Sequence, residues 1–174
     1  MGQSFHFPLQ TLEVALRNVI HQAIATEFGA DWPQEQTCRN ILHPKQVEDI
    51  TKAERRHYSI KGRAATTPQI VASLSLGFWT ALLRRNYNRH LWANQTTAAF
   101  PHLRPGDSIS VVSAKVNNVQ DLRNRIFHQE PLLGHDLSRE YGDILAVLGW
   151  ICPETREWVR SHSSVPDVIR ARPR

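Results

Sequence analysis

Cysteine, methionine and long apolar runs are scarce in this 174-residue chain, which has two Cys and one Met. Cys38 and Cys152 lie far apart and outside any CxxC or CxxH pattern, so we expect reduced thiols rather than a disulfide framework or a zinc site. No stretch reaches about 18 apolar residues, which excludes a membrane-spanning helix of the usual length. The segment that starts at Met1 lacks the basic and apolar regions of a secretory signal. Together these absences predict a cytoplasmic protein with no membrane partner.

Nucleotide-binding, serine-hydrolase and metal motifs are also missing. The sequence contains no Walker A motif, no GxGxxG and no GxSxG. Its nine histidines form no HExxH or HxxxH pair and no cluster with aspartates. We therefore expect neither a metal ion nor a cofactor.

Arginine, by contrast, is abundant. The chain has 17 Arg against four Lys, and its net charge is +5. A guanidinium group binds phosphate through two parallel hydrogen bonds and stacks on bases, so this composition favours a nucleic-acid partner. A GC-rich coding sequence would produce the same excess, and composition alone does not separate the two interpretations.

Helical periodicity runs through most of the chain, and no clear period-two alternation is present. Apolar residues recur at three- and four-residue steps, and Pro8, Thr67-Pro68 and Ser108 are typical of helix starts. The predicted helices cover 8–28, 44–61, 67–85, 108–129, 137–148 and 153–161, with loops at 31–33 and 94–107. The aromatic residues that we assign to the core or an interface are Phe78, Trp79, Tyr87 and Trp92. We expect an all-α bundle of five to six helices in one domain, 1–168, followed by a basic tail, 169–174.

The predicted helix over 108–129 has an unusual apolar stripe. Its apolar positions step by three, four and three residues from Ile109 to Val119, and then by seven to Ile126. We assign the missing core position to Arg123, where a charge is costly unless it is paired or faces a crevice or a partner subunit. Pro131 disfavours helical geometry at the preceding residue, which puts His128 in the last helical turn.

Arg123 and His128 together suit RNA cleavage. An imidazole can take or give a proton at the 2′-hydroxyl or at the leaving oxygen, and a guanidinium can neutralise the charge that builds on phosphate. Asn124 is four residues before His128 and shares its face. Spacing alone has little value, because Arg84 and Arg85 with His90, and Arg156 with His162, are spaced similarly. The alternative for Arg123 and His128 is an ion pair with Glu130 or a helix-terminal cap.

Four segments, taken in their order along the chain, resemble segments of one family. The segment from Leu122 to Pro131, LRNRIFHQEP, resembles the signature of the Abi-like (abortive-infection) branch of the HEPN superfamily. Three others agree: LEVALRN from Leu12 with His21, SLGFWTALL from Ser75, and LGWICPET from Leu148. This resemblance spans roughly residues 9–168. It implies a HEPN-like helical bundle that dimerises. The implied activity is that of a metal-independent endoribonuclease of phage-defence, abortive-infection or toxin systems. The implied partners are RNA, a second copy of the chain, and an antitoxin or inhibitor protein.

The resemblance also implies roles for single residues. Arg123 and His128 would be catalytic, and Asn124 would be the polar residue that follows the Arg. Members of the family often have the sequence His-His-Glu-Pro at this point. In this chain Gln129 replaces the second His, which puts any role of a second imidazole in doubt. Some HEPN domains only bind RNA or a protein, so a catalytically silent module is the alternative, and a helical scaffold without a nucleic-acid ligand is a third interpretation.

Four further residues are candidates for supporting or RNA-contacting roles. Glu130 either holds His128 or Arg123 or is a simple exposed carboxylate. Arg125 is a solvated charge or a phosphate contact. Arg17 and Asn18 either line the cleft beside the motif or have structural roles, which for Arg17 would be an i,i+4 pair with Glu13.

Overall fold

Every regular element of the chain is helical in the computed structural model, which describes residues 2–132 and 134–171. Across these residues there are ten α-helices and no strand. The all-α prediction is confirmed, and the prediction of five to six helices is wrong.

The helices have the following bounds. In chain order they are α1 (His6–Phe28), α2 (Gln36–Ile41), α3 (Pro44–Lys61), α4 (Thr67–Ser73), α5 (Leu76–Ala81), α6 (Ala93–Ala99), α7 (Ile109–Phe127), α8 (Leu137–Ile151), α9 (Pro153–His162) and α10 (Val165–Arg170). Short 3-10 turns occupy Gly2–Phe5 and Arg85–Tyr87, and a π-helical turn occupies Asn88–Trp92.

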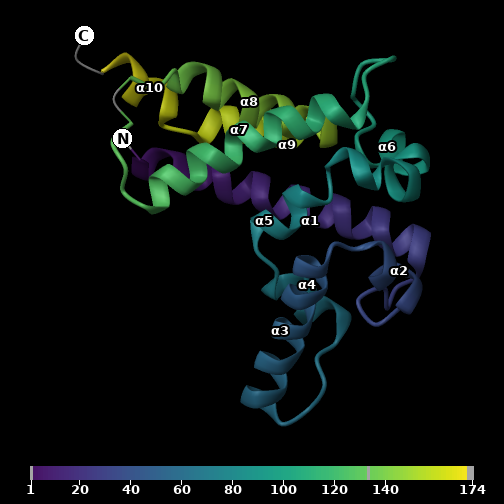
Figure 1. Cartoon of the computed structure of the whole chain (residues 1–174). Helices are drawn as coiled ribbons and strands as arrows, with labels where there is room; N and C mark the ends of the chain where they lie inside the picture. The colour runs from purple at the N-terminus through teal and green to yellow at the C-terminus, as the bar shows by residue number, and fades with distance from the viewer. Residues whose placement is uncertain (1, 133, 172–174) are drawn as a thin grey trace.

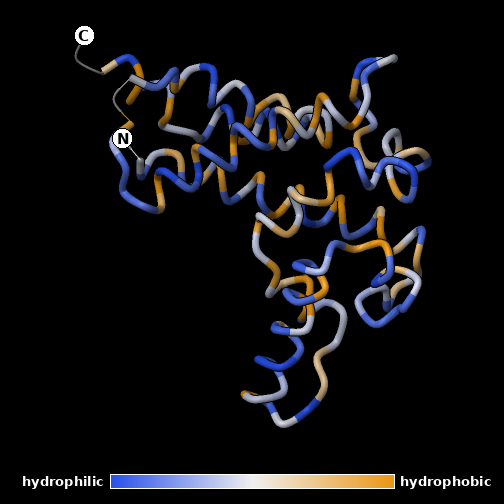
Figure 2. Tube along the Cα trace, viewed as in Figure 1, coloured by the Kyte–Doolittle hydropathy of each residue, from blue (hydrophilic) through white to orange (hydrophobic). Residues whose placement is uncertain are grey.

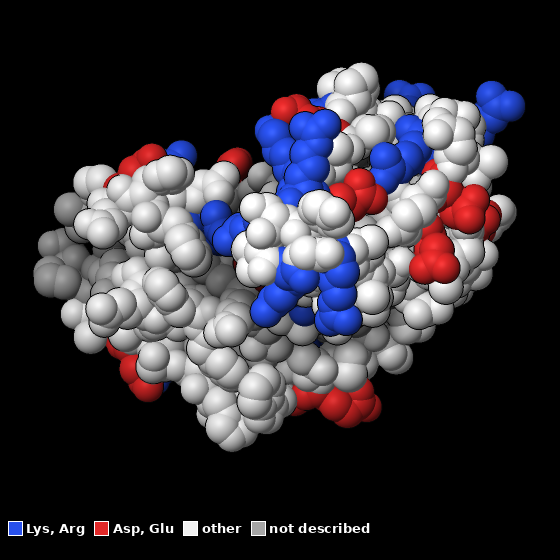
Figure 3. Space-filling model, turned by 90° about the horizontal axis from the view of Figure 1, so that it is seen from below, with Lys and Arg blue, Asp and Glu red and all other residues white. Residues whose placement is uncertain are grey.

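The long helices form the body of the molecule. α8 packs against both α7 and α9, and α1 packs against α8 and α9 (Figure 1). α5 contacts both α1 and α7, whereas α3 and α4 pack on each other and extend away from the body. Hydrophobic segments face inward along the long helices, and the far end of α3 is mainly hydrophilic (Figure 2). Lys and Arg side chains gather toward the middle of the face to which α3 points (Figure 3).

An aromatic cluster forms the centre of the core next to α1. The Trp32 ring lies 6.3 Å from the rings of Phe78 and Trp79, and those two rings are 5.0 Å apart, measured between centroids. Tyr87 and Trp92 are also buried. The prediction that the aromatic residues from Phe78 to Trp92 belong to the core is therefore confirmed.

The helix predicted over 67–85 is interrupted. α4 ends at Ser73, Leu74 is extended, and Ser75 starts α5 by accepting a hydrogen bond from the Phe78 amide at 3.4 Å. A serine that bonds to nearby backbone competes with helix continuation. The N-terminal cap of α4 is Thr66 rather than Thr67, whose hydroxyl instead donates to Asp31.

Short helices account for the other differences. α6 covers part of the loop predicted over 94–107, and contacts with α1, including a hydrogen bond from Gln95 to Glu27 at 2.6 Å, hold it in place. α2 and α10 were not predicted. α10 runs through the boundary that we placed after residue 168, and residues 172–174 of the predicted basic tail lie outside the described part of the chain.

One buried carboxylate ties α7 to α8. Asp143 on α8 is nearly fully buried, and it accepts hydrogen bonds from Lys115 at 2.5 Å and from Asn118 at 2.9 Å, both on α7. Because both carboxylate oxygens are satisfied, the buried charge is compensated and fixes how the two helices align. α7 is therefore held firmly along its middle, and its C-terminal half reaches the start of α1.

Candidate functional site

The C-terminal half of α7 and the N-terminal half of α1 enclose a groove of about 360 Å³. Its lining residues are His6, Leu9, Gln10, Glu13, Val14 and Arg17 from α1, and Arg123 and Phe127 from α7. Leu9 is buried beneath this surface, and the other lining residues are partly or fully exposed. The groove therefore has walls that carry two guanidinium groups and one carboxylate, Glu13, over an apolar floor.

Arg123 flanks the core stripe of α7 instead of occupying it. The missing core position belongs to Leu122, which is 1% exposed, while Arg123 is half-buried at the groove. Our assignment of Arg123 to the stripe is therefore wrong. The step from Val119 to Leu122 to Ile126 is the ordinary three-then-four spacing of a buried helix face.

The Arg123 guanidinium has one stacking partner and one unused donor. Its central carbon lies 4.1 Å from the centroid of the Phe127 ring, which favours the cation by its quadrupole. Its Nε atom is buried, and no described residue accepts a hydrogen bond from it. A buried donor without a partner is costly, so an acceptor that reached this N–H would relieve that cost.

Arg17 brings a second cation to the same groove from a distant part of the sequence. It lines the groove opposite Arg123, as one of our two interpretations of this residue expected. No ion pair joins it to Glu13 among the residues that the structure describes. Asn18 is exposed and does not line the groove. Two guanidinium groups that face one hollow favour a ligand with negative charge.

His6 and Phe127 are groove residues that the sequence analysis missed. The imidazole of His6 stacks on the Phe127 ring at 5.6 Å between centroids, with 19° between the planes. The same two side chains also line a neighbouring hollow of about 530 Å³, together with Gln129 and Glu130. The Phe127 ring therefore packs against both the Arg123 guanidinium and the His6 imidazole. Phe127 is 55% exposed, and the signal available in the sequence was an aromatic residue directly after the stripe residue Ile126, and so beside the buried face of the helix.

α7 ends two residues earlier than predicted, and His128 forms its C-terminal cap. The Gln129 amide donates to Ile126 O at 3.2 Å and the Glu130 amide donates to Arg125 O at 2.9 Å, while Gln129 has a φ of +57°. This is the hydrogen-bond pattern of a Schellman cap. His128 is exposed and is not among the lining residues of the groove, so one chain does not bring Arg123 and His128 together. Asn124 is half-buried, and its carbonyl accepts from the His128 amide at 2.9 Å.

Arg125 and Glu130 belong to a different network. Arg125 lies 3.1 Å from Nε2 of His135, whose Nδ1 lies 3.2 Å from Glu140 on α8, and Glu130 approaches Arg125 at 3.8 Å. The distances fit an imidazole that accepts from Arg125 and donates to Glu140. Glu130 thus pairs with Arg125, and among the described residues it forms no hydrogen bond or ion pair with Arg123 or His128.

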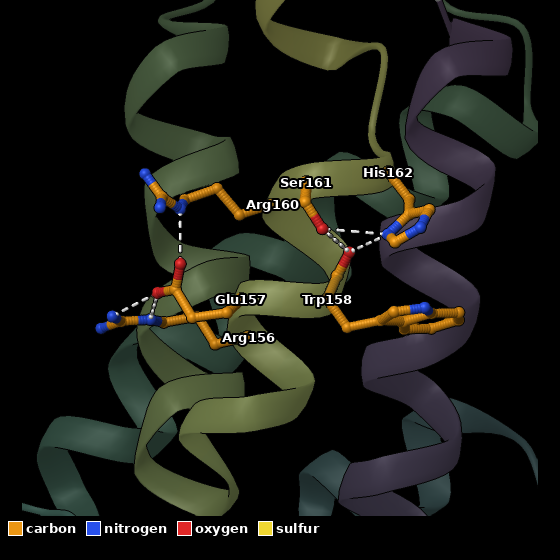
Figure 4. A network of polar contacts seen from close by, with 6 residues as sticks. All are labelled: Arg156, Glu157, Trp158, Arg160, Ser161 and His162. Atoms are coloured by element: carbon orange, nitrogen blue, oxygen red, sulfur yellow. Dashed lines mark hydrogen bonds and ion pairs between the residues drawn. The ribbon is translucent and has the colours of Figure 1, made fainter.

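The other two Arg–His pairs of similar spacing differ from the first. Arg156 pairs with the neighbouring Glu157 at 2.5 Å, and His162 contacts the Trp158 carbonyl at 2.8 Å, so both remain on α9 (Figure 4). Arg84 and Arg85 line a hollow at the start of α7, but both are exposed, and His90 does not join them. Arg123 therefore stands apart by its half-buried, stacked guanidinium.

No metal-binding cluster and no membrane-crossing helix is found in the described part of the chain. No three or more His, Cys, Asp or Glu side chains come together there in a way that could hold a metal ion. None of its helices combines the length and the apolar character needed to cross a membrane. Comparison with protein families, with curated proteins and with solved structures finds no match for this chain.

Proposed function

We propose that this protein is a cytoplasmic, metal-independent endoribonuclease of the HEPN Abi-like type, acting in a bacterial phage-defence, abortive-infection or toxin system. The observation that carries the proposal is the half-buried Arg123 guanidinium, whose Nε–H has no partner in the described chain and which shares a groove with Arg17. An RNA phosphate would supply the missing acceptor and the negative charge.

The chemistry assigns a separate task to each group. The 2′-oxygen attacks the adjacent phosphorus, and the bond to the 5′-oxygen breaks, which leaves a 2′,3′-cyclic phosphate and a 5′-hydroxyl. His128 accepts the proton of the 2′-hydroxyl or, when protonated, donates one to the leaving oxygen. Arg123 stabilises the charge that develops on phosphate, and Asn124 orients the site.

A homodimer would complete this site. His128 is about 140° around α7 from Arg123, because successive residues turn by about 100°. The groove has two exposed apolar side chains, Val14 at 39% and Phe127 at 55%. A two-fold contact over this face would cover both and bring His128 of one chain to Arg123 of the other, so that a dimer has two composite sites.

A catalytically silent module that binds RNA or a protein partner, such as an antitoxin or inhibitor, is the second candidate. The observation that favours it is the position of His128, which does not line the groove of its own chain. This candidate predicts salt-sensitive RNA binding without strand scission.

The test is RNA cleavage in the presence of EDTA. Wild type is expected to leave cyclic-phosphate ends and to spare DNA, and the Arg123→Ala/His128→Ala variant is expected to be slower by about 100-fold or more. The matched control is Arg156→Ala/His162→Ala, a pair of the same residue types that remains on α9, which should cleave like wild type. Full cleavage by His128→Ala would contradict the assignment, and no cleavage by wild type would favour the silent module.

Mixing single variants tests the composite site. An equimolar mixture of Arg123→Ala and His128→Ala forms mixed dimers in which one of the two sites has both residues. We expect recovery of about a quarter of the wild-type activity, because about half of the dimers are mixed. A mixture no more active than its components would place each site within one chain.

A further inference from the structure

The end of α3 and the turn after it form a protruding arm, residues 52–63, which we call the basic arm. Ala53 is the last buried residue of α3, and the next buried residue in the sequence is Thr67. The helix continues for eight residues past Ala53, which is about 12 Å at 1.5 Å per residue. Glu54 and His57 are partly buried on this part of the helix, and its other side chains are exposed.

The basic arm holds most of the net charge of the protein. It contains five Lys and Arg residues and one carboxylate, so four of the five net positive charges of the chain lie within twelve residues. Glu54 forms an ion pair with Arg39 at 2.8 Å, and Lys52 forms one with Glu48 at 2.6 Å. The remaining four cations, Arg55, Arg56, Lys61 and Arg63, have no ion pair with any described residue.

Complementing the helix dipole does not account for this arrangement. One or two cations in the last turn of a helix are enough to compensate its partial negative charge. Here Arg55 and Arg56 precede the last turn, and Arg63 follows Gly62, which ends the helix in the left-handed conformation. An excess of unpaired cations on a protruding element instead favours a polyanionic ligand.

Two exposed apolar side chains lie among these charges. Tyr58 is 62% exposed and Ile60 is 65% exposed. Tyr58 lies one helical turn after Arg55 and one turn before Lys61, so its ring has a cation on either side along the helix. An aromatic ring between cations is the arrangement by which proteins stack a base while they neutralise the neighbouring phosphates.

We propose that the basic arm binds the phosphodiester backbone of single-stranded RNA, with Tyr58 stacking on a base. All four unpaired cations of the arm are exposed, and Figure 3 shows Lys and Arg side chains gathered on the face toward which α3 points. The arm shares no lining residue with the groove of Arg123, so it is a separate binding site on the same chain. The choice of RNA over DNA rests on the proposed ribonuclease function.

The test is fluorescence anisotropy of the full chain with a labelled, uncleavable 2′-O-methyl RNA of about 20 nucleotides. The arm variant is Arg55→Gln/Arg56→Gln/Lys61→Gln/Arg63→Gln. The matched control removes four other exposed cations without a described ion pair, as Arg84→Gln/Arg85→Gln/Arg89→Gln/Arg104→Gln. We expect the arm variant to bind about tenfold more weakly or worse, with a salt slope smaller by up to about 3, and the control to lose less than about threefold. Tyr58→Ser should weaken binding about fivefold or more.

Several results would overturn the proposal. These are unchanged binding by the arm variant, an equal loss in the control, failure of wild type to bind the RNA, or tighter binding of single-stranded DNA of the same sequence. Melting curves of the variants should match wild type, because all the substituted side chains are exposed. Binding is measured separately from cleavage, because the 2′-O-methyl RNA lacks the attacking 2′-hydroxyl. Arm-dependent binding without any cleavage would therefore reject the proposed activity and leave the arm as an RNA site.

Discussion

Gln129 is the only non-glycine residue with a positive φ among residues 2–132 and 134–171, and it lies in the candidate motif. A side chain in the left-handed region is strained, and glycine is the usual residue at this position of a Schellman cap. Gln129→Gly relieves that strain but also increases the freedom of the unfolded chain. We expect Gln129→Gly to raise the free energy of unfolding by up to about 1 kcal/mol in urea titrations. Gln129→Val should lower it by about 1 kcal/mol or more, because β-branched residues avoid this conformation. The opposite order would contradict the cap.

His21 makes stability depend on pH. Burial lowers the pKa of His21 below its ordinary value of 6.5, and its Nδ1 accepts a hydrogen bond from the Trp32 indole at 3.0 Å. The unfolded chain therefore binds the proton at a higher pH than the folded chain does. The contribution of His21 is complete above about pH 6.5 and is lost as the pH falls toward the lower folded pKa. The free energy of unfolding between pH 7.5 and 5 should fall less steeply in His21→Gln than in wild type. His90→Gln, at an exposed position, is the control and should keep the wild-type slope; a His21→Gln slope equal to wild type would reject this account.

At the scale of single helices, α7 shows how neighbouring positions differ. Leu122 packs in the core, whereas the adjacent Arg123 faces the groove. Leu122→Ala should lower the free energy of unfolding by about 2–5 kcal/mol, because it leaves a cavity in the core. Arg123→Met should cost less than about 1 kcal/mol, because an unbranched apolar side chain can still cover part of Phe127 and the position flanks the core. Chemical denaturation of both variants tests this, and equal losses would contradict the placement of Arg123 outside the stripe.

At the scale of the whole molecule, the two thiols report on opening of the fold. Cys38 is fully buried, and burial raises its pKa to about 12, whereas Cys152 is partly exposed. Because Cys38 is fully buried and its thiol is disfavoured as the reactive thiolate, its modification requires opening of the structure. A chromogenic disulfide reagent should modify one thiol per native chain rapidly and the second about 100-fold more slowly or worse. Cys38→Ser and Cys152→Ser assign the two phases, and both thiols should react together in denaturant. Equal rates in the native protein would contradict the burial of Cys38.

The sequence by itself determined the helical class and the long helices. The ranges predicted for α1, α3, α7, α8 and α9 agree with the structure to within a few residues, because periodicity and end signals act over one or two turns. The break before Ser75 and the short helices were not predictable in this way. A helix of six or seven residues is not stable alone, and its formation depends on packing against distant partners such as α1.

Only the tertiary structure decided the composition of the candidate site. The sequence named Arg123 and Arg17 separately, and the packing of α1 on the body of the molecule placed them in one groove with His6 and Phe127. The same packing leaves His128 outside that groove and pairs Glu130 with Arg125. Local patterns specify which face of a helix is apolar, but they do not specify which helix covers it. A groove between two elements far apart in the chain therefore exists only once their apolar faces have met.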